Sequence, residues 1–183
     1  MSPQPPRNIV RLSAAFYLPM MASGAFMRPP GTIRVDDPGR LLMGLAAALL
    51  IGLLVVGLSR FAARGTGWGR ALHSEFHSVL GALDSRQILL LALLSGFGEE
   101  LLFRGVLYPR LGLIGSALLF AVLHFPYRKT LIPWSVFALV LGVVLGVLTG
   151  ASGSLWPAIF LHFFINYYNL HDLTGDSPLT PDN

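Results

Sequence analysis

Long apolar stretches recur along this chain, and they constrain its fold more than any other feature. The stretch from Leu41 to Ser59 contains no charged side chain, and about 20 apolar residues are what an α-helix needs to cross a bilayer. Charged residues make up only 12% of the 183-residue sequence, against roughly 25% in soluble domains. The sequence therefore predicts an all-α, polytopic membrane protein that forms a single integral membrane domain over residues 1–183.

About six segments are predicted to span the membrane. They are Asn8–Met27, Leu41–Ser59, Gln87–Tyr108, Leu111–Phe125, Ile132–Thr149 and Leu155–Leu170. Before the third span, residues 71–83 repeat apolar side chains at helical spacing, which predicts an amphipathic helix in the membrane interface. Asp84 or Ser85 is expected to cap the third span. The tail, residues 171–183, is predicted to be disordered.

The basic residues lie mostly between the apolar stretches, where they report topology. A net charge of +4 could suggest a nucleic-acid partner in a soluble protein, but here the expected partners are membrane lipids and not nucleic acid. With the N-terminus inside, eight basic residues fall on inner segments and four on outer loops. This bias predicts that both termini are cytoplasmic. The chain is rich in Arg, Ala, Gly and Leu, which suggests a bacterial source. The predicted location of the protein is then the bacterial inner membrane.

Six polar residues interrupt the apolar pattern inside three of the predicted spans. An ionised side chain at the bilayer centre costs about 2.5–3.5 kcal/mol even on the mildest scale, so such residues are functional candidates by default. A lone histidine or a lone Glu–Arg pair is more often structural. Together on three helices, however, these groups favour a site. The candidates are Glu99, Glu100, Arg104, His124, His162 and Asn166.

The spacing of these residues suggests how they are used. Glu100 and Arg104 are four residues apart, so they share a helix face and can pair. Glu99 points about 100° away from Glu100 and has no partner on its own helix. Two further pairs at the same interval are Phe120 with His124 and His162 with Asn166. Three helices therefore each present a polar face, which is how sites in helical bundles are assembled.

Other features are interpreted as structural. His73 and His77 have the spacing of metal ligands, but they lie in a polar segment with no third ligand nearby, which indicates a solvated face. Gly142, Gly146 and Gly150 predict a face on which helices pack closely. Cysteine is absent, which excludes disulfides, thiolate nucleophiles and zinc–thiolate sites.

Three sequence motifs resemble those of the CPBP family, which comprises type II CaaX prenyl endopeptidases together with bacteriocin-processing and abortive-infection proteins. Glu99-Glu100-Leu101-Leu102-Phe103-Arg104 resembles the family's EExxxR motif. Phe120-Ala121-Val122-Leu123-His124 resembles FxxxH, and His162-Phe163-Phe164-Ile165-Asn166 resembles HxxxN. The resemblance covers residues 83–166, the predicted catalytic core.

The resemblance implies an intramembrane endopeptidase with defined residue roles. Glu99 and His124 would activate a water, and His162 and Asn166 would stabilise the oxyanion. Glu100 and Arg104 would support the shape and charge balance of the site. The implied substrate is a membrane-anchored or lipidated protein or peptide precursor. A CaaX substrate is not expected, because bacteria generally do not prenylate proteins.

Three alternatives remain open at this point. Glu99, His124 and His162 could bind zinc as a metalloprotease set; we favour a site without metal or cofactor, because His162 and Asn166 already have roles and no HExxH motif occurs. The chain could instead be a catalytically silent membrane scaffold or an immunity-type binding protein. A proton-coupled transporter is disfavoured, because the inverted repeats typical of transporters are not evident.

Overall fold

A computed structural model describes residues 9–32, 35–124 and 129–174 of the chain. This part of the chain is helical and contains no strand, as the all-α prediction requires. The predicted span ends at Asn8 and Phe125 lie outside the described residues. The helices are α1 (Ile9–Met27), α2 (Pro38–Gly65), α3 (Gly67–Leu80), α4 (Ser85–Leu102), the π-helix η1 (Phe103–Leu107), α5 (Tyr108–Leu123), the 3-10 turn η2 (Lys129–Leu131), α6 (Ile132–Ser152) and α7 (Trp156–Thr174).

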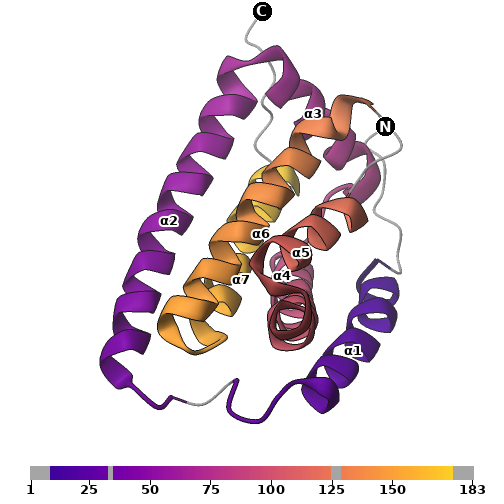
Figure 1. The fold of residues 1–183 in the computed structure, drawn as a ribbon. Helices are drawn as coiled ribbons and strands as arrows, with labels where there is room; N and C mark the ends of the chain where they lie inside the picture. Colours follow the sequence, from indigo (N-terminus) through magenta and orange to yellow (C-terminus); the bar gives the residue numbers. More distant parts are fainter. Residues whose placement is uncertain (1–8, 33–34, 125–128, 175–183) are drawn as a thin grey trace, which may run out of the picture.

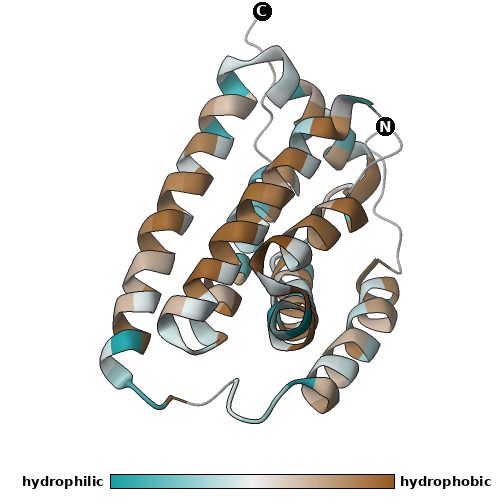
Figure 2. Ribbon diagram, in the orientation of Figure 1, coloured by the Kyte–Doolittle hydropathy of each residue, from teal (hydrophilic) through white to brown (hydrophobic). Residues whose placement is uncertain are grey.

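The protein is a polytopic helical membrane protein. Four helical stretches among the described residues are long and apolar enough to span a membrane: Ile9–Met27, Pro38–Gly65, Ser85–Leu123 and Ile132–Ser152. The middle of α2 is apolar, and its polar residues lie at its two ends (Figure 2). Each of the six predicted spans corresponds to a helix. The last of them, α7, is not among the four stretches.

The third and fourth predicted spans form one helical stretch that folds back on itself. The π-helix η1 precedes Pro109, whose ring would clash with the carbonyl of residue 105 in a regular α-helix. The chain then turns at Gly112, where φ is 71°, a conformation that glycine adopts without strain. The rings of Phe103 and Phe120 lie 4.9 Å apart. The turn therefore returns the second half of α5 to η1, next to the C-terminal end of α4.

The centre of the bundle is α7, which packs against α2, α4 and α6 (Figure 1). α5 packs on α6, and α1 packs on α4 and η1. The predicted glycine face of α6 is present, and it packs on α5. A Cβ atom at Gly142 would lie 3.2 Å from the Cα atom of Ala117, and one at Gly150 would lie 2.7 Å from the hydroxyl of Tyr108. The glycines let α5 approach the backbone of α6 closely.

The amphipathic segment before the third span is helix α3, at the end of the bundle where α2 ends and α4 begins (Figure 1). Asp84 caps α4, as predicted: its carboxylate accepts hydrogen bonds from the backbone N–H groups of Arg86 and Gln87. The Gln87 side chain accepts in return from the backbone N–H of Asp84. This reciprocal capping box fixes where α4 begins.

The predicted disordered tail begins too early. α7 continues to Thr174, so residues 171–174 are helical, and residues 175–183 lie outside the described residues. Arg60 of α2 donates two hydrogen bonds to the carboxylate of Asp172, at 2.6 and 3.1 Å. This long-range partner stabilises the last turn of α7, and a reading of local composition could not include it.

The prediction of a solvated face for His73 and His77 is also wrong. Both lie on α3 and point at the C-terminus of α7. The Nε2 atom of His73 lies 3.2 Å from the carbonyl oxygen of Asp172, and Nδ1 of His77 lies 2.8 Å from that of Leu173. Because a carbonyl only accepts, both ring nitrogens donate. The histidines therefore satisfy carbonyls that the last helical turn leaves without partners.

Candidate active site

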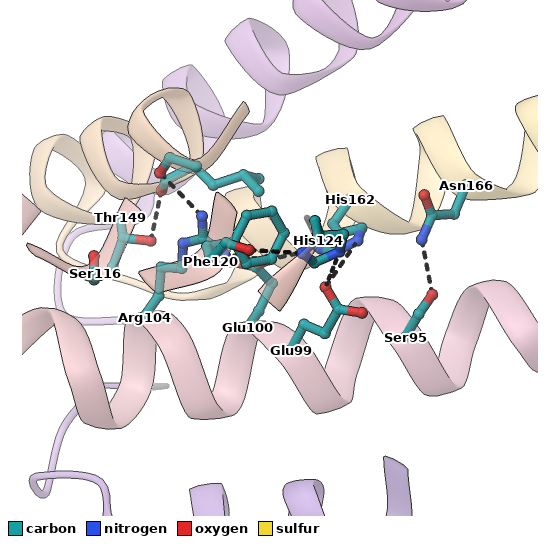
Figure 3. A network of polar contacts seen from close by, with 12 residues as sticks. Ser95, Glu99, Glu100, Arg104, Ser116, Phe120, His124, Thr149, His162 and Asn166 are labelled. Atoms are coloured by element: carbon teal, nitrogen blue, oxygen red, sulfur yellow. Dashed lines mark hydrogen bonds and ion pairs between the residues drawn. The ribbon is translucent and has the colours of Figure 1, made fainter. Parts of the chain in front are cut away.

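The structure brings the six candidate residues together inside the bundle (Figure 3). Glu99 and Glu100 come from α4, and Arg104 comes from η1. His124 follows the last residue of α5, so the hairpin at Gly112 delivers it to the site. His162 and Asn166 lie one turn apart on α7, facing α4.

Glu100 is the centre of a fully buried polar network. Its Oε1 atom accepts hydrogen bonds from Nη1 of Arg104 at 2.9 Å and from Nδ1 of His162 at 2.7 Å. Arg104 also donates to the carbonyl of Gly142 at 2.9 Å, and its guanidinium carbon lies 4.6 Å from the centre of the Phe120 ring. The Glu100–Arg104 pair expected from the spacing is therefore present. It also fixes the His162 ring and links α4, α6 and α7.

The carboxylate of Glu99 has one occupied and one open oxygen. Tyr17 of α1 donates its hydroxyl hydrogen to Oε1 at 2.9 Å. Oε2 lies 3.6 Å from Nε2 of His124 and 3.8 Å from Nε2 of His162. It is buried and has no hydrogen-bond partner within the described part of the chain. A buried carboxylate oxygen without a donor is unfavourable. Oε2 of Glu100 shares this property, but of the two carboxylates only Glu99 lines the cavity, so a molecule in the cavity would bind at Glu99.

The geometry of His124 defines which of its nitrogens faces Glu99. Its Nδ1 atom lies 2.7 Å from the carbonyl oxygen of Phe120, so Nδ1 carries the hydrogen. In the neutral ring Nε2 is then the free base, and Nε2 is the atom that faces Glu99. The ring packs between Phe120, at 4.3 Å, and Trp134, at 5.0 Å. These contacts hold the imidazole in one orientation.

Asn166 is held by a residue that the sequence interpretation missed. Its Nδ2 atom donates to the hydroxyl of Ser95 at 2.8 Å, and Ser95 donates to the carbonyl of Ala92 at 3.3 Å. This leaves one amide N–H of Asn166 available to a ligand. Ser95 lies four residues before Glu99, which puts both on one face of α4. That spacing could have identified Ser95, whereas nothing local could have identified Tyr17.

The site opens into a small cavity beside a larger cleft. The cavity is about 130 Å³, and a single water needs only about 10–15 Å³ of such space. The cleft is about 810 Å³ and lies between α1, α2, α3, α4, α6 and α7. Cavity and cleft share four lining residues, so they adjoin: Tyr17, Trp134, Phe137 and Asn166.

The zinc alternative can be compared with this geometry. A tetrahedral zinc with ligands at about 2.0–2.2 Å sets neighbouring ligand atoms about 3.3–3.5 Å apart. The two separations from Glu99 Oε2, 3.6 and 3.8 Å, are somewhat wider. Within the described ranges no three His, Asp or Glu side chains are grouped as metal ligands. The set named from the sequence, Glu99, His124 and His162, thus gathers around Oε2 of Glu99 at separations slightly wider than zinc ligation sets.

Comparison with known proteins confirms the family resemblance. The family model described as type II CAAX prenyl endopeptidase Rce1-like matches residues 82–168. This segment, just under half of the chain, is therefore similar to the Rce1-like family. YpbD of Bacillus subtilis (strain 168), described as an uncharacterized protein, is 41% identical over 81 residues. These residues are 43% of this chain and 41% of YpbD, so the match spans about two fifths of that relative. No solved structure matches the chain.

The Rce1-like segment contains all six candidate residues and also Ser95. It does not contain α1, α2 or α3. Three helices outside the segment close the site: α1 supplies Tyr17, and α2 and α3 line the larger cleft. The active-site cavity is therefore built partly from residues that the family match does not cover.

Proposed function

We propose that this protein is an intramembrane endopeptidase that hydrolyses a peptide bond with a water activated by Glu99 and His124. The observation that carries the proposal is the open Oε2 atom of Glu99. It is buried, lacks a donor within the described residues, and faces the Nε2 atoms of two histidines at 3.6 and 3.8 Å. A water in the adjoining cavity would meet a carboxylate and an imidazole base together, which is the arrangement that general base catalysis requires.

In the proposed mechanism the water loses a proton to Glu99 or His124 as it attacks the peptide carbonyl. Nδ1 of His124 is committed to the Phe120 carbonyl, so Nε2 is free to take the proton. The same two groups then return a proton to the leaving amine. Because the first transfer and the second use the same acid–base pair, the site ends the cycle in its starting state.

Two donors are proposed to stabilise the oxyanion that forms on the peptide carbonyl. Asn166 has one free N–H, since the other is held by Ser95. His162 donates through Nε2 when its ring carries both protons, and the Glu100 carboxylate at Nδ1 is the counter-charge for that form. With His162 in this form, Glu99, Glu100, His162 and Arg104 are electrically balanced, which a low-dielectric interior favours. Each such donor lowers the activation free energy by about 2.7–4 kcal/mol.

The proposed substrate is a membrane-anchored or lipidated protein or peptide precursor. The supporting feature is the cleft of about 810 Å³ beside the catalytic cavity, whose walls include Val55, Leu58 and Leu72. An apolar segment of a membrane-associated chain would bury its surface there. Arg60 and Arg64 line the end of the cleft near α3, which suits a substrate whose polar part stays at the basic side of the membrane.

A metal is not part of the proposed mechanism. Zinc, if bound, would be held by Glu99, His124 and His162 and would supply a Lewis acid. The metal-free form keeps His162 as an oxyanion donor and leaves its Nδ1 contact with Glu100 in place.

The activity is tested by comparing peptide termini in the membrane proteome of cells that express the wild type, Glu99→Gln or no protein. We expect new termini from a small set of precursors only with the wild type. Glu75→Gln on α3 is the matched control, since Glu75 lines neither cavity, and it should behave like the wild type. If Glu99→Gln restores every effect of the wild type, the protein is a scaffold or immunity-type binding protein and not a protease.

A second arm uses purified protein in liposomes with a pooled library of palmitoyl-anchored, internally quenched peptides. Wild type and Glu75→Gln should cleave members of this library. Glu99→Gln and His124→Ala should each be inactive but folded, because each removes one of the two groups that hold the water. Near-normal turnover by either variant would refute their assigned role.

A further inference from the structure

Helix α1 lies outside the family-matched segment, yet it contacts the reacting group. Tyr17 is half-buried on α1 and donates to Oε1 of Glu99 at 2.9 Å, over a sequence separation of 82 residues. The roles proposed above involve only residues of α4, η1, α5 and α7. They leave open what decides which oxygen of Glu99 faces the water.

The Glu99 carboxylate needs an external constraint. The torsion that rotates a glutamate carboxylate is broad and two-fold, so the side chain alone does not fix its oxygens. His124 and His162 both lie beyond hydrogen-bond distance from Oε2, at 3.6 and 3.8 Å. Among the described residues, the Tyr17 hydroxyl is the group that hydrogen-bonds to this carboxylate. It occupies Oε1 and so leaves Oε2 towards the histidines.

The packing of α1 on α4 is built to place this hydroxyl. Gly98 precedes Glu99, and a Cβ atom there would lie 3.0 Å from Cδ1 of Tyr17. About two helix turns after Tyr17 on α1, a Cβ atom at Gly24 would lie 2.7 Å from Cβ of Leu101 and 2.8 Å from its carbonyl carbon. Two glycines, one on each helix, thus let the helices approach until the ring of Tyr17 lies directly against α4.

We propose that Tyr17 is a positioning residue: by donating to Oε1 of Glu99 it directs Oε2 at the reacting water and makes α1 part of the active site. This inference rests on the proposed function of Glu99 as the group that activates the water. Tyr17 also lines both the catalytic cavity and the larger cleft. It therefore stands where the scissile peptide passes from one to the other.

The test separates positioning from general structural support. Tyr17→Phe keeps the ring and removes the donor, and it should lower kcat about 10- to 100-fold while KM for a cleaved library peptide changes less than twofold. Replacing Tyr17 by 4-aminophenylalanine restores an N–H donor at the same place and should recover most of the turnover. Tyr167→Phe on α7 is the matched control. It removes a hydroxyl that lines neither cavity and should leave kcat unchanged.

A thermal double-mutant cycle tests the same contact without any substrate. Tyr17→Phe should lower the Tm of the purified protein by about 3–8 °C, and this loss should disappear in a Glu99→Ala background because the acceptor is then gone. Additive Tm changes, or a kcat of Tyr17→Phe equal to the wild type, would overturn the inference. If the wild type cleaves no library peptide while the cycle shows coupling, the contact stands and the hydrolytic proposal fails instead.

Discussion

Glu99 and Glu100 are neighbours in the sequence, yet their carboxylates have different surroundings. Glu100 accepts from Arg104 and His162 through one oxygen and has no exposed surface. Glu99 accepts from Tyr17 instead. The second oxygen of each carboxylate has no donor among the described residues, but of the two only Glu99 lines the cavity. Because consecutive helical residues point about 100° apart, one helix can present a structural carboxylate to α7 and a reactive one to the cavity.

The Glu100–Arg104 pair gives the first prediction. Glu100→Leu or Arg104→Leu alone should lower the free energy of unfolding by about 3–5 kcal/mol, because each leaves a buried charge without its partner. The double variant should recover much of that loss but remain inactive, since Nδ1 of His162 loses its acceptor. Unfolding in detergent and turnover in liposomes measure the two effects. Simple additivity of the two stability losses would contradict the pairing.

The second prediction concerns metal. Exhaustive chelation should leave turnover unchanged, because the water is proposed to be held by Glu99 and His124 directly. His162→Ala should slow turnover about 100- to 1,000-fold if His162 donates to the oxyanion, with peptide binding retained. A preparation that contains about one zinc per chain, loses activity when stripped and regains it with added zinc would identify a metalloprotease instead.

Single residues show what sequence patterns could predict about the site. The i, i+4 intervals identified the pairs Glu100–Arg104 and Phe120–His124, because such pairs depend on helix geometry alone. Tyr17, His73 and His77 have partners 82 to 99 residues away. Those contacts depend on how helices pack, and no local pattern encodes them. Tyr17 was therefore missed, and the two histidines were interpreted as solvated.

At the scale of helices, apolar length predicted which segments are helical but not how they end. The third and fourth predicted spans are joined by a π-helix and by a kink at Gly112, where the backbone is not helical. A hydropathy profile averages over many residues, so it does not detect such a bend. The end of α7 at Thr174 likewise depends on α2 and α3, which contribute Arg60, His73 and His77.

The packing of α1 on α4 gives the third prediction. Gly24→Ala should destabilise the protein and lower kcat, because the added methyl group meets backbone and Cβ atoms of Leu101 at 2.7–2.8 Å and must push α1 and Tyr17 away from Glu99. Gly57→Ala on α2 is the matched control. Nothing lies within 4 Å of its added methyl group, so it should stabilise the helix by about 0.5–1 kcal/mol. Equal Tm values for the two variants would exclude the close contact.

At the scale of the whole molecule, the bundle has one end with more basic residues. Arg60, Arg64, Arg70 and Arg86 lie where α2 ends, α3 crosses and α4 begins. The helix ends on the opposite side hold fewer described basic residues, namely Arg28, Arg40 and Arg110. Positive charge favours the cytoplasmic side, which would place α3 and the basic end of the larger cleft there.

This orientation gives the fourth prediction. Reporter fusions at Arg64 and at the C-terminal Asn183 should both report the cytoplasm, and a fusion in the loop before α2, at Asp36, should report the opposite side. A periplasmic signal at Asn183 with a cytoplasmic one at Arg64 would mean that an odd number of spans separates the two positions. Membrane fractionation of each fusion controls for failed insertion.

The division of the cleft between two parts of the gene bears on how such a protein could diversify. The Rce1-like segment carries the groups proposed to hydrolyse the peptide bond, while α1, α2 and α3 supply more than half of the cleft's lining residues. A recombination event near Gly81 could therefore give the same chemistry a new set of targets in one step. The new N-terminal part would have to meet one condition: its first helix must place a hydroxyl group against Glu99, as Tyr17 does here.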